Sequence, residues 1–165
     1  LCTGSACIAI SLSLAFPDAT VIAVDNSDKA LQVAARNISA TGAAVQLVKG
    51  DILTWNPPAL PVSDIIVSNP PYVTESEKKE MHTNVLDHEP HEALFVPDAD
   101  PLLYYRHITA VADAVLAPRG SIWLEVNESF ADQTARLLRR DTYGAARVIE
   151  DIRGKKRFVK AEKNG

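Results

Sequence analysis

The chain has 165 residues, of which 47% are hydrophobic and 23% charged, and its formal net charge is −4 at pH 7. This composition is typical of a soluble globular protein and excludes collagen-like, disulfide-rich and wholly disordered chains. No apolar run approaches the roughly 18 residues that a membrane helix needs, so no membrane partner is expected. The first residues lack the layout of a secretory signal, and the two cysteines, Cys2 and Cys7, fit a reducing, cytoplasmic location.

The charge is unevenly distributed along the chain. Residues 1–135 are strongly acidic, whereas residues 136–165 hold most of the lysines and arginines. The acidic part argues against a protein that mainly grips phosphate backbones. The basic end has two interpretations: a solvated helix face followed by an edge strand protected by Lys and Arg, or a contact with an acidic partner or RNA.

Apolar periodicity and turn signals predict alternating strands and helices. Helices are expected over residues 8–16, 27–40, 102–116 and 131–140, the third of them ending before Pro118, Arg119 and Gly120. Strands are expected over residues 20–24, 45–48, 64–67, 121–126, 147–150 and 157–160. Residues 69–100 have no clear period. The alternation predicts an α/β fold with a mostly parallel sheet, and the last two strands are too close for a crossover helix, so they are expected to be antiparallel.

Ligands of such sheets bind beyond the carboxyl ends of the strands. The turn before the first helix consists of small residues, namely Cys2, Thr3, Gly4, Ser5 and Ala6, and Asp25 ends the next strand. A turn of this kind exposes backbone N–H groups, and an acidic residue about 20 positions later can accept both hydroxyls of a ribose.

The number of glycines in this turn discriminates between cofactors. A dinucleotide site needs three glycines around its pyrophosphate, whereas this turn has only Gly4, which disfavours a nicotinamide oxidoreductase. S-adenosylmethionine has a ribose and an adenine but no phosphate, so the turn favours S-adenosylmethionine. The alternative for Asp25 is a polar residue that ends a strand beside a helix cap.

The segment formed by residues 69–72, called here the Asn-Pro-Pro-Tyr segment, follows the strand expected over residues 64–67. Pro70 and Pro71 have no N–H, so their carbonyls form a rigid wall of acceptors. Asn69 adds a side-chain carbonyl, and Tyr72 adds a flat face for stacking. This set suits a planar NH₂ group, such as a glutamine amide or the exocyclic amine of adenine. The alternative is a strand-end loop that is proline-rich without a function.

With these residues the chain resembles the HemK/PrmC family of S-adenosylmethionine-dependent methyltransferases, which modify the glutamine of the Gly-Gly-Gln motif in peptide chain release factors. The matching positions are residues 1–6, Asp25, Asp51, residues 69–72, Glu89, Pro90, Ala93, Leu94, Glu125, Asp151, Gly154 and Arg157. The resemblance covers essentially the whole chain and implies a Rossmann-like class I methyltransferase fold. Ala6 and Asn127 depart from it, because the family commonly has glycine at both positions.

The resemblance also bears on domain organisation. The family's aspartate before Leu1 and its N-terminal substrate-docking domain have no counterpart in this sequence. Residues 1–165 are therefore expected to be one catalytic domain with a truncated first strand. A cofactor-binding fragment without activity is an alternative for such a chain.

The expected mechanism assigns a role to each group. The Asn69 side chain and the Pro70 carbonyl accept the two protons of the substrate amide, with Pro71 beside them and Tyr72 packed on the amide plane. Residues 2–6 line the methionine part of the cofactor, which Asn69 also contacts, and Asp25 binds its ribose. Asp51 and Ile52 face the adenine; their alternatives are a turn residue after Gly50 and plain core packing.

Further polar residues have less defined roles. Glu89 and Glu92 either order the long loop over the substrate or solvate it, and Glu125 either faces the site or caps the next element. The spacing of His82, His88 and His91 matches no metal-ligand pattern, so no metal is expected. The expected partner is a release factor, with an indirect contact to the ribosome or RNA through the basic end. The alternative activity is methylation of an adenine or guanine amine in nucleic acid.

Overall fold

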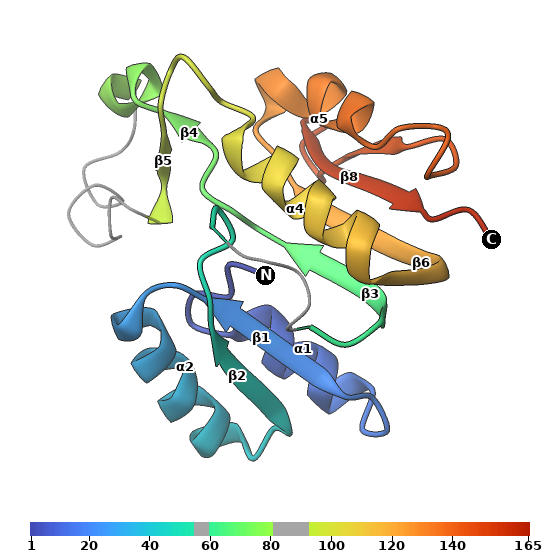
Figure 1. Cartoon of the computed structure of the whole chain (residues 1–165). Helices are drawn as coiled ribbons and strands as arrows, with labels where there is room; N and C mark the ends of the chain where they lie inside the picture. Colours follow the sequence, from blue (N-terminus) through green and yellow to red (C-terminus); the bar gives the residue numbers. More distant parts are fainter. Residues whose placement is uncertain (55–59, 81–92) are drawn as a thin grey trace. The chain divides into compact units, whose positions relative to one another are not determined.

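A computed structural model describes residues 1–54, 60–80 and 93–165. The chain divides into two units, Leu1–Trp55 and Asn56–Gly165, and each is considered by itself (Figure 1). Within the described ranges, no helix combines the length and the apolar character that crossing a membrane requires.

The first unit alternates helices and strands: α1 (Cys7–Ala15), β1 (Val21–Asp25), α2 (Asp28–Thr41) and β2 (Val45–Lys49). The two strands pair in parallel, from Val21 opposite Val45 to Asp25 opposite Lys49. The Ser27 hydroxyl caps α2 by accepting the N–H of Ala30, and Gly42 ends the helix in the left-handed conformation. All four elements agree with the sequence prediction to within one or two residues.

Both helices of the first unit pack against the strand pair and against each other. Their small side chains permit this close approach, and the core is formed by Ala6, Ala9, Ile10, Ala23, Ala34 and Ala43. The packing holds the turn before α1 beside the carboxyl end of β1, because Ala6 itself belongs to this core.

The second unit contains a four-stranded sheet in the order β3-β6-β8-β7. Its strands are β3 (Ser63–Ser68), β6 (Leu116–Glu125), β7 (Arg147–Glu150) and β8 (Lys156–Glu162). β3 and β6 are parallel, whereas β8 runs antiparallel to both β6 and β7, so the predicted antiparallel C-terminal pair is confirmed. The helix α4 (Leu103–Val115) contacts β6, and α5 (Ala131–Leu137) contacts β7 and β8 (Figure 1).

The start predicted at residue 121 for the strand over residues 121–126 is wrong, because β6 begins at Leu116, directly after α4. Pro118, Arg119 and Gly120 therefore lie inside the strand rather than in a turn before it. Arg119 adopts a φ of 66°, and the register between β3 and β6 shifts here. The Arg119 N–H donates to the Lys163 carbonyl and the Lys163 N–H to that of Gly120, which satisfies the irregular backbone.

Two short strands were not predicted. β4 (Val73–Thr74) and β5 (Phe95–Val96) form a parallel pair, and the 3-10 helix η2 (Ser76–Glu80) follows β4. Two-residue strands are too short to leave a periodic pattern, which explains why sequence analysis missed them. A second 3-10 helix, η4 (Glu128–Phe130), precedes α5, which ends at residue 137 rather than 140 because Leu138 turns into the core.

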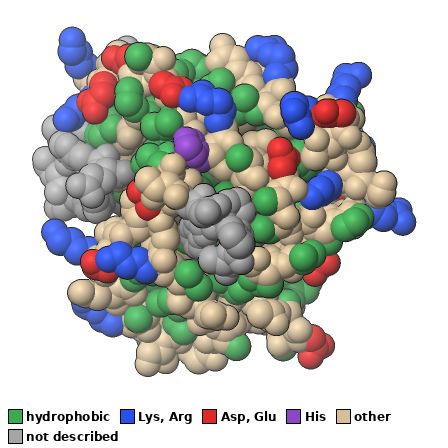
Figure 2. All heavy atoms as spheres, viewed as in Figure 1, with side chains coloured by type: hydrophobic (Ala, Val, Ile, Leu, Met, Phe, Trp, Pro, Cys, Tyr) green, Lys and Arg blue, Asp and Glu red, His purple; other side chains and the backbone are tan. Residues whose placement is uncertain are grey.

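Much of the basic C-terminal end is engaged locally. Lys156 pairs with Asp132, Lys155 with Glu128, and Lys160 lies over the Trp123 ring. β7 forms an edge of the sheet and exposes Arg147 there. On the face shown in Figure 2, blue side chains of the described residues stand apart from one another, several of them beside red ones. These observations favour the edge-strand interpretation of the basic end; a contact with RNA stays a prediction.

Gly120 offers a test of the strand register. A Cβ at this position would lie 2.7 Å from Leu116 Cδ2, 2.9 Å from the Ala117 carbonyl and 3.0 Å from that of Asp64. We expect Gly120→Ala to lower the free energy of unfolding by about 1–3 kcal/mol through overpacking. Gly144→Ala is the matched control, since its Cβ would meet only the Glu162 carbonyl at 3.8 Å. Equal stability of the two variants in urea denaturation would contradict the close approach of β3 to β6.

Candidate functional site

The turn before α1 has an unusual backbone. Cys2, Gly4 and Ala6 all have positive φ values, of 53°, 55° and 64°. The Thr3 N–H donates to the Val24 carbonyl, which ties the turn to β1. Among the described residues, no atom beyond the two chain neighbours would lie within 4 Å of a Cβ at Gly4, so they leave the space beside it open. Left-handed φ values at alternate positions let the backbone N–H groups of neighbouring residues point to the same side of the turn, which they cannot do in an extended chain.

Asp25 contacts this turn directly. Its Oδ2 accepts the Gly4 N–H at 2.8 Å, and its Oδ1 accepts the Ser27 N–H at 3.0 Å. Gly4 of the turn expected to line the methionine part of the cofactor and Asp25, the residue expected at its ribose, therefore lie together. Asp25 also fits the alternative interpretation of a polar residue that ends a strand beside a helix cap, because it accepts the N–H of Ser27, the residue that caps α2. Each carboxylate oxygen keeps a second lone pair for a further donor.

Asn37 of α2 was missed by sequence analysis. Its Nδ2 donates to the Ser5 carbonyl at 2.9 Å, so α2 holds the turn from a position 32 residues away. An asparagine in the middle of a helix belongs to no recognisable sequence motif. Its role is visible only in the tertiary structure, where α2 packs against α1 and Asn37 reaches Ser5.

Asp51 and Ile52 follow β2. The Gly50 N–H donates to the Asp25 carbonyl at 2.9 Å, which joins the ends of the two strands. Asp51 Oδ1 accepts the Leu53 N–H at 3.0 Å, as a turn residue does, and Ile52 is 5% exposed. The geometry thus agrees with the alternatives of a turn residue and core packing, and a role of either residue toward adenine stays a prediction.

The Asn-Pro-Pro-Tyr segment lies in the second unit, directly after β3. The Asn69 side chain is exposed, whereas Pro70 and Pro71 are buried and Tyr72 is partly buried. Its exit is held by β4, where the Val73 N–H donates to the Leu94 carbonyl at 2.9 Å. The buried prolines fix the backbone on both sides of the Pro70 carbonyl, while Asn69 is accessible to a ligand.

Tyr72 is oriented by Glu125 at the end of β6. The Tyr72 hydroxyl donates to Glu125 Oε1 at 2.9 Å. Burial, together with the negative charge of Glu125 and this hydrogen bond, raises the pKa of Tyr72 to about 12. The Tyr105 hydroxyl donates to the Glu125 carbonyl at 3.2 Å. Of the two roles considered for Glu125, the structure therefore shows contact with the predicted site.

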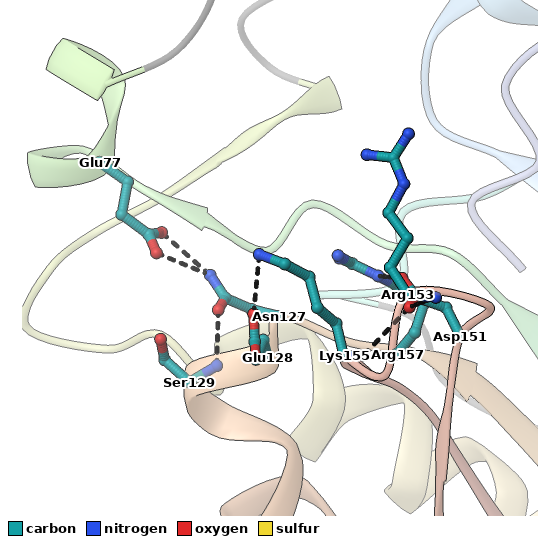
Figure 3. Close-up of polar contacts among 8 residues, drawn as sticks. All are labelled: Glu77, Asn127, Glu128, Ser129, Asp151, Arg153, Lys155 and Arg157. Carbon is teal, nitrogen blue, oxygen red and sulfur yellow. Dashed lines mark hydrogen bonds and ion pairs between the residues drawn. The ribbon is translucent and has the colours of Figure 1, made fainter.

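Asn127 was noted in the sequence only as a departure from glycine, yet its amide joins several segments (Figure 3). Its Nδ2 donates to the Tyr72 carbonyl at 3.3 Å and to Glu77 Oε2 at 2.9 Å, and its Oδ1 accepts the Ser129 N–H at 2.9 Å. Glu77 was missed altogether. Thr74 and Glu77 have the Thr-x-x-Glu spacing of a capping box, which is the signal that would have found it.

The Asp/Gly/Arg pattern forms the turn between β7 and β8. Asp151 Oδ1 accepts the N–H groups of Arg153 and Lys155, Gly154 has a φ of 76°, and Asp151 Oδ2 lies 3.7 Å from Arg157 Nε (Figure 3). The backbone N–H groups of Lys155 and Arg153 hold the pKa of Asp151 below its usual value, assisted by the charge of Arg157. The turn therefore anchors Arg157, whose charge in turn opposes the rise in the pKa of Tyr72.

The second unit has an open cavity of about 390 Å³ beside these segments. It is lined by polar groups from three parts of the unit: Tyr72, Glu77, Asn127, Glu128, Lys155 and Arg157. Figure 3 shows all of these except Tyr72. Lys155 pairs with Glu128 at 3.2 Å across it. The cavity adjoins the tyrosine of the Asn-Pro-Pro-Tyr segment and is large enough for a few side-chain-sized groups.

Some predicted residues lie outside the described ranges. These are Glu89, Glu92, His82, His88 and His91, so the interpretations of the long loop stay predictions. In residues 1–54, 60–80 and 93–165, no three His, Cys, Asp or Glu side chains gather in a way that suits a metal ion. Neither Cys2 nor Cys7 forms a disulfide.

The sequence is similar to known proteins over nearly its whole length. A family model described as methyltransferase small domain matches residues 1–95. A release factor glutamine methyltransferase of Bacteroides thetaiotaomicron is 45% identical over 98% of this chain and 58% of that protein. One of Flavobacterium psychrophilum is 44% identical over 96% of this chain and 55% of that protein. The chain thus spans somewhat more than half the length of these relatives.

A solved structure supports the fold class. The methyltransferase of Pyrococcus furiosus is 19% identical to this chain and superposes with a TM-score of 0.69. The match includes 99% of this chain and 72% of the Pyrococcus chain. This likeness confirms the expected Rossmann-like α/β fold.

The Tyr72–Glu125 contact predicts a pH effect. The raised pKa means that the stabilisation from the neutral phenol is complete below pH 10 and is lost as the pH rises through about 12. Glu125→Gln keeps an acceptor but removes the charge, so we expect the pKa of Tyr72 to fall below its value in the unmodified chain. Ultraviolet difference titration of Glu125→Gln, with and without Tyr72→Phe, measures it. Glu128→Gln is the charge-matched control, and an equal fall in that variant would contradict the assignment to Glu125.

Proposed function

Since this chain belongs to the methyltransferase small domain family, we propose that it catalyses S-adenosylmethionine-dependent methylation of the glutamine amide in the Gly-Gly-Gln motif of peptide chain release factors. Residues 1–165 would belong to the catalytic domain. The observation that carries the proposal is the Asn-Pro-Pro-Tyr segment, with its buried prolines, exposed Asn69 and hydrogen-bonded Tyr72. The names of the two Bacteroides and Flavobacterium relatives support the choice of release factors.

The first unit fits S-adenosylmethionine. The open space beside Gly4 leaves the backbone of residues 2–6 accessible to the methionine part, and Asp25 keeps lone pairs for the ribose hydroxyls. Cys2, Thr3, Ser5 and Ala6 would line the same turn, and Asp51 and Ile52 would lie toward the adenine. When bound, S-adenosylmethionine supplies a methyl group on a positively charged sulfur.

The second unit fits a planar amide. The nitrogen of an amide is a poor nucleophile because its lone pair is delocalised into the carbonyl. Asn69 Oδ1 and the Pro70 carbonyl would accept the two N–H protons, which aims the nitrogen lone pair at the methyl group, while Pro71 and Tyr72 pack beside the amide. Orientation and preset dipoles would supply most of the rate enhancement. As the nitrogen–methyl bond forms, the sulfur–methyl bond would break and sulfur would keep its electron pair. The extra proton on nitrogen would then pass to water, so no strong general base is required.

The hydrogen bond of Tyr72 bears on the same step. A phenol whose proton is donated to Glu125 and whose pKa is about 12 stays neutral at physiological pH. A neutral ring presents no negative charge to the carbonyl acceptors beside it, so it can pack on an amide without competing for the amide protons.

Tritium-labelled S-adenosylmethionine tests the function directly. We expect the full-length protein containing this sequence to transfer label to a release factor. In the Asn69→Ala variant we expect kcat to fall at least about a hundredfold. Isothermal titration should give a cofactor Kd within about threefold of the original for that variant. Asn164→Ala, which changes an exposed asparagine of the same unit, is the control for general effects.

The labelled acceptor decides between the alternatives. Label on nucleic acid instead of the release factor would establish the amine methyltransferase, and cofactor binding without any transfer would establish an inactive binding module. Full activity of Asn69→Ala would refute the role of that side chain.

Asp25 tests the cofactor half. Asp25→Asn removes the charge and one acceptor from the group that meets Gly4 and Ser27. We expect the Kd for S-adenosylmethionine to rise about tenfold to a hundredfold, the usual effect of losing a hydrogen bond to a charged group. Asp28→Asn is the matched control, because Asp28 is exposed and pairs only with Lys49 in the described contacts. Equal effects of both variants would indicate a general loss of negative charge rather than ribose binding.

A further inference from the structure

The side chain of Asn127 lies at the junction of three segments of the second unit. It follows the end of β6 and is 8% exposed. Its Nδ2 donates to the Tyr72 carbonyl at 3.3 Å, and to Glu77 Oε1 and Oε2 at 3.1 and 2.9 Å. Its Oδ1 accepts the Ser129 N–H at 2.9 Å at the start of η4. A glycine at this position, as the family resemblance leads one to expect, would make none of these contacts.

The hydrogen-bond donor capacity of this amide is fully used. Nδ2 has two hydrogens, of which one faces the Tyr72 carbonyl and the other is shared by the two oxygens of Glu77. The amide cannot be turned over, because its oxygen would then meet the Glu77 carboxylate and its NH₂ would meet the Ser129 N–H. The contacts on either side therefore determine which atom faces Tyr72.

Glu77 is held in its charged form. Thr74 donates to Glu77 Oε2 through its N–H at 2.8 Å and through its hydroxyl at 2.9 Å. Burial opposes ionisation, but the hydrogen bonds from Thr74 and Asn127 outweigh it and hold the pKa of Glu77 below its usual value. At neutral pH the carboxylate is thus an acceptor that orients Asn127.

Tyr72 is consequently fixed at both ends. Its hydroxyl donates to Glu125, and its carbonyl accepts from Asn127. The next N–H, that of Val73, donates to Leu94. Because Pro70 and Pro71 have no N–H, these bonds at Tyr72 and Val73 are what orients the segment on its C-terminal side.

We propose that Asn127 is a positioning residue for the reaction: by holding the Tyr72 carbonyl, it sets the placement of the Asn-Pro-Pro-Tyr segment that receives the acceptor amide. The inference rests on the proposed function for its kinetic consequence. It goes beyond that function because it assigns the segment's placement to the side chain of Asn127 and its partner Glu77.

Asn127→Asp separates positioning from capping. The introduced carboxylate still accepts the Ser129 N–H, but it cannot donate to Tyr72 and it repels Glu77. We expect kcat to fall about tenfold to a hundredfold, with KM for S-adenosylmethionine and for the release factor within about threefold, as misplacement of a reacting group does. Hydrogen–deuterium exchange of the Val73 and Thr74 amides should become faster. Asn164→Asp, an exposed change of the same kind, should alter neither.

The double variant Asn127→Asp with Glu77→Gln distinguishes positioning from stability. The amide introduced at position 77 can donate to the carboxylate at position 127 and accept the Thr74 N–H, so the repulsion is removed and thermal stability should return. The Tyr72 carbonyl still lacks its donor, so kcat should stay low. Recovery of kcat together with stability would overturn the positioning role and leave Asn127 with a structural one.

The kinetic result also separates this inference from the proposed function. If the full-length protein methylates the release factor and Asn127→Asp does so with unchanged kcat, the positioning role is wrong and the proposed function stands. If the unmodified protein transfers no methyl group to the release factor, the proposed function is wrong. The exchange rates of Val73 and Thr74 then decide: faster exchange in Asn127→Asp alone supports the positioning role, and unchanged exchange refutes it.

Discussion

Two adjacent prolines cannot anchor themselves through backbone N–H groups, and much of the second unit is arranged around this constraint. Before the prolines, Ser68 pairs with Leu124 in the sheet. After them, Tyr72 bonds through its hydroxyl and its carbonyl, and the Val73 N–H reaches Leu94. The two prolines are thus held on both sides by contacts to residues at the end of β6, to Asn127 after it, and to Leu94 just before β5. Their own carbonyls are acceptors held in a fixed direction.

The first unit solves a comparable problem with a single carboxylate. A turn with positive φ at Cys2, Gly4 and Ala6 is costly for the two residues that carry a Cβ, so it requires fixed contacts. Asp25 supplies one by accepting the Gly4 N–H, and Asn37 supplies another through the Ser5 carbonyl. The same carboxylate that shapes the turn is the group proposed to bind a ribose. Shape and binding are therefore coupled at this residue, and a change there affects both.

Several charged side chains of the second unit form ion pairs with residues close to them in space. Asp151 gathers the N–H groups of its own turn and faces Arg157, while Lys155 and Lys156 pair with Glu128 and Asp132. Pairs as exposed as these contribute little to the free energy of folding individually. Their effect is on geometry, because they hold the turn between β7 and β8 beside the cavity next to Tyr72. Two residues of the basic end, Lys155 and Arg157, thus line the cavity of the candidate site.

Local patterns in the chain were enough to predict the order and type of most elements, the antiparallel C-terminal pair, and the residues of the turn, Asp25 and the Asn-Pro-Pro-Tyr segment. These features depend on apolar periodicity, small residues, caps and prolines, all of which act over a few positions. Folding in three dimensions was needed to bring Tyr72 to Glu125, 53 positions away, and Asn127 to Glu77, 50 positions away. It also extended β6 through Pro118, because Ser63 pairs with Leu116 and Lys163 satisfies the irregular backbone. Such contacts depend on strand register and on the packing of distant segments, and neither is encoded in any short stretch of the chain.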